Sequence, residues 1–116
     1  MPSPTHLTLH AVSRTVEVGY DDGQVFTLSH EFLRVHSPSA EVQGHGSGQE
    51  ILQTGKRQVY IESVSPVGHY AVQPRFSDGH HSGLFSWDFL YFLGTQQSLL
   101  WDEYLLKLKH VNASRD

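Results

Sequence analysis

Histidines are the residues of this chain whose type and spacing suggest chemistry most directly. The sequence holds nine of them, and several lie in two short polar segments, 36–45 and 80–81. Imidazole nitrogens together with a carboxylate oxygen can hold zinc or iron. If the first segment folds over the second, the candidate metal ligands are His36, Glu41, His45, His80 and His81. The alternative is that these side chains are hydrogen-bonded or solvated, and for most of the nine histidines we favour it.

The segment 33–46 is also rich in serine and glycine, and it lies between clear helix and strand patterns. Loops of this kind carry function more often than the scaffold does. Its glycines do not match a dinucleotide or Walker pattern, which leaves only an unspecific anion site formed by loop amides and basic side chains. We predict a binding loop made of Arg34, Ser37, Ser39, Gly44 and Gly46, together with Lys56.

No catalytic motif stands out. The sequence has no G-x-S-x-G elbow, and no histidine is followed two positions later by the carboxylate that a non-haem iron oxygenase needs. Serines close to histidines in sequence do not by themselves define a triad. We therefore expect a protein that is not an enzyme.

The composition limits the classes of protein to which the chain can belong. A length of 116 residues predicts a single domain, 1–116, that folds without needing a metal or disulfide. The absence of cysteine excludes disulfides, thiolate zinc sites and cysteine-ligated clusters. A net charge of −4 argues against nucleic acid as a partner, and no apolar run approaches membrane-spanning length. We expect a cytoplasmic protein with neither a nucleic-acid nor a membrane partner.

Strand, turn and helix signals follow one another in the same order twice. In the first copy a strand leads through the turn 21–23 to a second strand and the helix cap Ser29. In the second copy the turn 77–79 leads in the same way to Ser86, and a Phe-Leu pair follows each cap. We predict an α+β fold, a small and mostly antiparallel sheet built from two hairpin-plus-helix units with helices packed on it. A last amphipathic helix is expected at about 95–111.

Apolar positions of these elements predict the core and its cover. Pro74 indicates an edge or bulge position in its strand, because proline lacks an amide hydrogen. The core is expected to contain Val16, Val18, Leu28, Ile61, Val72, Phe89 and Leu90. Four aromatic residues have two interpretations, and these are Trp87, Tyr91, Phe92 and Trp101. We expect most of them on the helix faces that cover the sheet, and the alternative is an exposed aromatic patch for a partner.

Three motifs together resemble one protein family. They are L-R-x-x-S-P-S-A-E at 33–41, G-H-Y-A at 68–71 and F-S-D-G-H at 76–80, the last followed by Ser-Trp. Over about 7–94 the chain is identified as a member of the DUF971 family, also described as the gamma-butyrobetaine hydroxylase-like N-terminal domain. The resemblance implies a stand-alone bacterial-type member. In other members the domain is joined to carnitine-pathway oxygenases or to P-loop scaffold proteins that handle iron–sulfur clusters.

The resemblance also implies where a metal of the family would lie. In the oxygenases this domain is not catalytic, contributes to oligomer contacts, and carries a zinc ion held by three cysteines and one histidine. The corresponding positions here are Ser37, Ser39, Val42 and His80, so three of the four ligands are replaced. The resemblance therefore implies that the 33–46 segment and the turn at His80 lie together.

We interpret the chain as a non-catalytic binding or accessory module that acts in protein interaction. A partner from iron–sulfur assembly, or from metal metabolism more broadly, is implied by the family's fusions alone. The alternative is a metal-binding protein that holds zinc or iron with its His-rich loop and turn.

Overall fold

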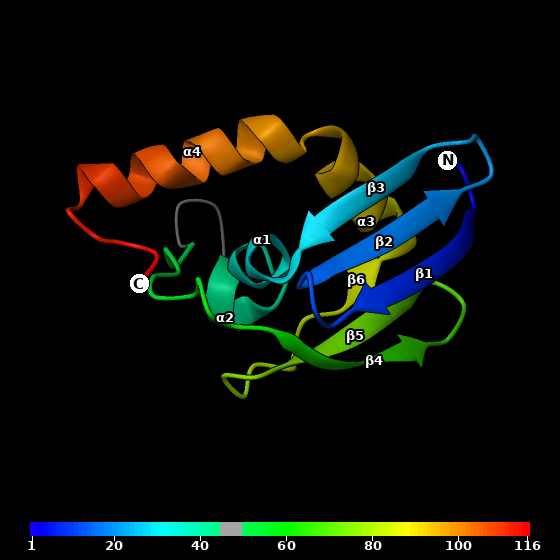
Figure 1. The fold of residues 1–116 in the computed structure, drawn as a ribbon, viewed down its shortest axis with the longest axis horizontal. Coiled ribbons are helices and arrows are strands. Elements are labelled where there is room, and N and C mark those ends of the chain that lie inside the picture. The colour runs from blue at the N-terminus through cyan, green and yellow to red at the C-terminus, as the bar shows by residue number, and fades with distance from the viewer. Residues whose placement is uncertain (45–49) are drawn as a thin grey trace.

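The strands form two three-stranded antiparallel sheets, ordered β1-β2-β3 and β4-β5-β6 (Figure 1). The computed structural model describes residues 1–44 and 50–116. The first sheet and the helices after it are β1 (Pro4–His10), β2 (Thr15–Tyr20), β3 (Val25–Ser29), α1 (His30–Val35) and α2 (Ala40–Gln43). The second part is β4 (Ile61–Val67), β5 (Ala71–Phe76), β6 (Phe85–Ser86), α3 (Trp87–Thr95) and α4 (Gln97–His110). The α+β class is confirmed, with the strands divided between two sheets.

One core is shared by both sheets and by α1 and α3. Of the predicted core residues, only Phe89 lies outside the buried set, because its ring stacks on Phe92 at the outer side of α3. Pro74 lies in β5, the central strand of its sheet, but at a position that is paired with β4 alone and is therefore an edge position on its other side. The residue is tolerated there because β6 is only two residues long and pairs with Ala71 and Val72 alone.

The chain contains two copies of one unit, β1-β2-β3-α1 and β4-β5-β6-α3. Both hairpin turns have glycine at the same place, with φ of 88° at Gly23 and at Gly79, a conformation that other residues rarely adopt. Each helix begins at a serine, Ser29 or Ser86, whose hydroxyl accepts the amide hydrogen three residues later. The predicted hairpin-plus-helix repeat is therefore present, and each copy has one more strand at its start.

The two units hold each other through the acidic residues of their turns. Asp22 in the first turn accepts the hydroxyl hydrogen of Tyr91 on α3 at 2.6 Å. Asp78 in the second turn accepts from the guanidinium of Arg34 on α1 at 2.9 Å. Arg34 and Tyr91 each lie five residues after the helix cap of their own unit. Each turn therefore contacts the helix of the other unit at the same position.

The C-terminal helix α4 and the tail after it cover α1 (Figure 1). Trp101 packs on Phe32 with ring centroids 6.3 Å apart, and Val35 is buried together with Tyr104 and Leu108. The tail returns along the segment before β4, where the amides of Gly55 and Arg57 donate to the carbonyls of Ser114 and Arg115. In the described parts of the chain, no helix is both long and apolar enough to cross a membrane.

Candidate functional site

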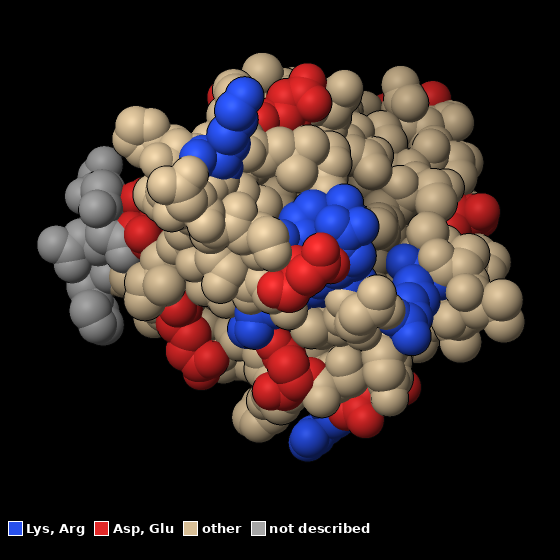
Figure 2. Space-filling model, turned by 60° about the vertical axis from the view of Figure 1, so that its left-hand side comes forward, with Lys and Arg blue, Asp and Glu red and all other residues tan. Residues whose placement is uncertain are grey.

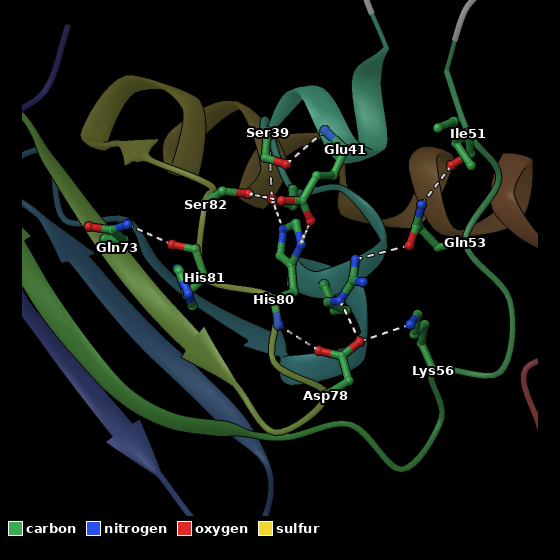
Figure 3. Close-up of polar contacts among 12 residues, drawn as sticks. Ser39, Glu41, Ile51, Gln53, Lys56, Gln73, Asp78, His80, His81 and Ser82 are labelled. Atoms are coloured by element: carbon green, nitrogen blue, oxygen red, sulfur yellow. Dashed lines mark hydrogen bonds and ion pairs between the residues drawn. The ribbon is translucent and has the colours of Figure 1, made fainter.

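The 33–46 segment and the turn at His80 lie together, as the resemblance implies. The chain leaves α1 after Val35, since a residue that precedes a proline avoids helical geometry, and Pro38 follows Ser37. Ser39 then caps α2, so its hydroxyl accepts from the amide of Glu41 at 3.1 Å. This short helix places Glu41 beside the His80 imidazole (Figure 3). Ser37, just before it, contacts the other nitrogen of the same ring.

Ser37, His80 and Glu41 form a continuous hydrogen-bonded chain, which we call the serine–histidine–glutamate clamp. The His80 Nε2 atom lies 2.8 Å from Ser37 Oγ, and its Nδ1 atom lies 3.0 Å from a Glu41 carboxylate oxygen. Ser82 donates to the other oxygen of that carboxylate at 3.0 Å. A neutral imidazole satisfies every contact, because Nδ1–H donates to the carboxylate and Nε2 accepts from the serine hydroxyl.

The surroundings of the clamp favour the neutral form of His80. Burial is the main cause that lowers the pKa of His80, and the positive charge of Arg34 lowers it further, against the opposing effect of Glu41. The hydroxyl of Ser82 and then the imidazole of His80 lower the pKa of Glu41. The clamp therefore joins a neutral imidazole to an ionised carboxylate at neutral pH.

We expect the folded protein to lose stability as the pH falls below 6.5, the ordinary histidine pKa. Burial is the main cause that lowers the pKa values of His30, His36 and His80 in the folded state, so the unfolded chain takes up protons first. The stabilising contribution of these three neutral imidazoles is complete above pH 6.5, and it is lost as the pH falls through their pKa values in the folded state. Urea unfolding between pH 7.5 and 5.5 measures this slope, and His80→Gln should reduce it. A free energy of unfolding that rises toward pH 5.5 would contradict the prediction.

Beside the clamp, a second polar cluster joins Arg34, Lys56 and Asp78. Asp78 accepts from the Arg34 guanidinium at 2.9 Å and from the Lys56 ammonium at 2.8 Å. Burial alone would raise the pKa of Asp78, but Lys56, the amide of His80 and Arg34 outweigh it and lower that pKa to about 2. Arg34 also donates to the side chain of Gln53 at 3.0 Å. This cluster ties α1, the 53–56 segment and the second turn to one carboxylate.

The predicted metal ligands do not gather around one point. His80 and Glu41 are in contact, whereas the Nδ1 atom of His36 lies 2.9 Å from the carbonyl of Phe32 in its own helix. His81 is exposed, and its ring points away from that of His80 (Figure 3), because neighbouring residues of an extended segment face opposite sides. His45 lies outside the described residues, as does Gly46 of the predicted binding loop. The part of the chain that the structure describes contains no group of three or more such side chains able to hold a metal.

We expect removal of metal to change the melting temperature little. The shared core contains none of the predicted metal ligands, and a direct hydrogen bond joins Ser37 and His80, two of the four positions that correspond to the family's zinc ligands. Thermal melts with and without EDTA at neutral pH test this, together with elemental analysis of protein purified without an affinity tag. Stoichiometric zinc or iron that is lost in His80→Ala would overturn it.

The residues of the predicted binding loop are engaged within the protein. Ser37 and Ser39 belong to the clamp region, Arg34 and Lys56 share Asp78, and Gly44 ends α2 at a φ of 71°. These contacts hold the loop in place. Sequence reasoning missed Asp78 as the partner of Arg34 and Lys56, although the carboxylate in the F-S-D-G-H motif was an available signal. It also missed Ser82 as the partner of Glu41.

The clamp has the connectivity of a Ser-His-Glu triad, but its exposure is reversed. In a hydrolase the serine must reach substrate while the acid is enclosed. Here Ser37 is 0% exposed, whereas the side chain of Glu41 is 67% exposed. The backbone of Gly83 covers Ser37, since a Cβ atom at that glycine would lie 2.2 Å from the serine oxygen. The two hydrogen bonds of His80 join the loop to the turn.

A groove lies on the other side of the loop, between α4 and the 50–53 segment. It encloses about 300 Å³. Its apolar lining comes from Val35, Val42, Ile51, Leu52 and Leu100, and its polar lining includes His36, Glu50, Glu103 and Lys107. Such a mixture of an apolar floor and a few polar groups is typical of binding sites. Sequence reasoning did not find this groove, because the chain segments that line it are far apart in sequence.

Comparison with known proteins places the chain in a family. The model of the gamma-butyrobetaine hydroxylase-like N-terminal domain matches residues 7–91. One similar protein, solved in solution by NMR, is 48% identical to this chain with a TM-score of 0.86, over 100% of this chain and 91% of that one. A second NMR structure is of a protein 50% identical to this chain with a TM-score of 0.84, over 99% of this chain and 86% of that one. Among curated proteins none matches the chain.

A crystal structure from Acidithiobacillus ferrooxidans ATCC 23270, of a protein of unknown function in the DUF971 family, is 41% identical to this chain. Its TM-score is 0.67, over 79% of this chain and 92% of that one. The chain therefore belongs to the gamma-butyrobetaine hydroxylase-like N-terminal family, also called DUF971.

Proposed function

We propose that the chain is a non-catalytic interaction module whose protein partner binds in the groove between α4 and the 50–53 segment. The observation that carries the proposal is the apolar lining of this groove next to exposed apolar residues. Ile51, which lines the groove, is 55% exposed, and Leu106, which lines an adjoining hollow that shares Leu52 and Lys107 with the groove, is 66% exposed. Apolar side chains left open to water beside a groove commonly mark a protein contact.

The charge distribution favours a protein over a nucleic acid as the partner. The face in Figure 2 carries basic and acidic side chains next to each other. The net charge of −4 would also repel a phosphate backbone. The family's fusions to iron–sulfur scaffold proteins support a partner in iron–sulfur or metal metabolism.

Site-specific photo-crosslinking tests this proposal. A benzophenone amino acid at position 51 should give a defined cross-linked product in extract from the source cells, and Lys107→Glu at the groove should remove it. The matched control is position 12, where Val12 is fully exposed in the turn between β1 and β2. The same products from both positions, or a product at position 51 that survives Lys107→Glu, would contradict the proposal.

A serine-directed probe tests the non-catalytic part separately. We expect a fluorophosphonate not to label the folded protein, because the nucleophile it needs, Ser37, is 0% exposed. Intact-mass spectrometry after incubation measures the labelling. A covalent adduct on Ser37 that disappears in His80→Ala would show that the clamp works as a catalytic triad.

A further inference from the structure

The outer face of α3 is open where the same face of α1 is covered. Counting from the two serine caps, Phe89 corresponds to Phe32 and Phe92 to Val35. Phe32 and Val35 are 2% and 7% exposed, whereas Phe92 is 49% exposed and Phe89 is half-buried. Phe92 therefore lies on the surface and does not cover the sheet, whereas Phe89 packs partly against the core and leaves its remaining surface open beside Phe92.

Helix α4 and the tail after it show which kind of segment packs on this face of α1. Trp101 of α4 packs on Phe32, and Tyr104 and Leu108 pack on Val35. Beyond the helix, the Arg115 guanidinium makes two hydrogen bonds, of 2.8 and 2.7 Å, to the carboxylate of Glu31. The occupant of the α1 face is thus an aromatic helix followed by an extended tail with an arginine.

The α3 face has matching features for both parts of such an occupant. Asp88 lies at the position of Glu31 and is exposed. Next to it is a hollow of about 250 Å³ between the N-terminus of α3 and the segment before β1, lined by Met1, Pro2, Ser3, Pro4, Tyr70, Ser86, Trp87 and Asp88. In the first unit the equivalent place, between α1 and the segment before β4, holds the tail through Gly55 and Arg57.

We propose that the outer face of α3 is a second docking surface, which takes an amphipathic helix of a partner protein followed by an extended, arginine-bearing tail. The apolar side of the helix lies on Phe89 and Phe92, the tail enters the hollow, and its arginine pairs with Asp88. The chain's own α4 is engaged on α1. A second copy would have to release its α4 to occupy this face, so the occupant is a different protein. This surface is separate from the groove and can be tested independently of it.

The probe is a synthetic peptide with the sequence of residues 96–116, because that segment already fits the equivalent face. Titrated into the full-length ¹⁵N-labelled protein, it should give saturable amide shifts at Asp88, Phe89 and Phe92. Phe92→Asp should weaken binding at least about tenfold. The matched control, Val12→Asp on a fully exposed turn, should leave the affinity unchanged.

Charge exchange tests the ion pair. Asp88→Arg should weaken binding of the peptide by about tenfold. A peptide that carries Arg115→Glu should bind the Asp88→Arg variant with the original affinity, because the two charges are then exchanged. Circular dichroism establishes that each variant is folded.

Three results would overturn the proposal. One is the absence of shifts on α3 at about 1 mM peptide, the weak limit of specific binding. Another is shifts at α1 in place of α3. The third is a concentration-dependent dimer of the chain alone, seen by sedimentation and lost in Phe92→Asp, which would make a second copy the occupant.

Discussion

We expect Arg34→Ala to lower the free energy of unfolding by about 3 kcal/mol. The Arg34 side chain is 8% exposed and that of Asp78 is 21% exposed, so the substitution removes one partner from a largely buried ion pair. Lys56 remains beside Asp78, but its ammonium is a point charge on a flexible stem and does not replace the planar guanidinium. The loss also separates α1 from the second turn, which carries His80. Urea unfolding followed by tryptophan fluorescence measures the change.

Tyr91→Phe is the matched control, because Tyr91 is the equivalent of Arg34 in the second unit. It removes one hydrogen bond to Asp22, in a polar contact open to solvent, and should cost less than about 1 kcal/mol. Equal losses in the two variants would show that the ion pair adds nothing beyond the packing of the units.

Gly83→Ala is the second substitution with a large expected effect, a loss of about 1–3 kcal/mol. The new methyl group would lie 2.2 Å from Ser37 Oγ, inside the buried clamp. Because the serine oxygen is held 2.8 Å from His80, it cannot move aside without breaking that contact. The loop should separate from the turn, and hydrogen exchange at Ser39–Gln43 should accelerate.

A double-mutant cycle distinguishes this clash from a general cost of alanine at position 83. In the Ser37→Ala background the nearest atom to the new methyl is a proline carbon at 3.4 Å, so Gly83→Ala should cost less there. Gly19→Ala is a second control, since the three atoms nearest its methyl group all belong to the ring of His6, an exposed side chain that can rotate away. If Gly83→Ala costs the same with and without Ser37, the clamp explanation fails.

Local signals were enough to predict much of the fold. Ser29 and Ser86 cap helices where the sequence places caps, and Gly23 and Gly79 take the positive φ that their turns need. These features depend on a few neighbouring residues. The additional first strand of each unit was not included in the predicted repeat, because β1 and β4 share no turn or cap motif that periodicity can match.

The site was less predictable, because its contacts join distant parts of the chain. Ser37 and His80 are 43 positions apart, and only the resemblance implied that their segments meet. Pairing of Arg34 with Asp78 depends on how the two units face each other, which no local pattern contains. The exposure of Phe92 likewise depends on which helix α4 covers, and it covers α1 and not α3. The sequence shows only that α1 and α3 both carry aromatic residues.

The reciprocal contacts between turns and helices have a consequence for the symmetry of the chain. In a dimer of two identical βββα subunits related by a twofold axis, the turn of each subunit would contact the helix of its partner, so the same contact would occur twice. The chain has that arrangement with unequal residues, Asp22 with Tyr91 and Asp78 with Arg34. A single chain thus reproduces the contact pattern of a twofold dimer, with one of its two helix faces left open. Helix α4, which lies beyond the matched residues 7–91, covers the other.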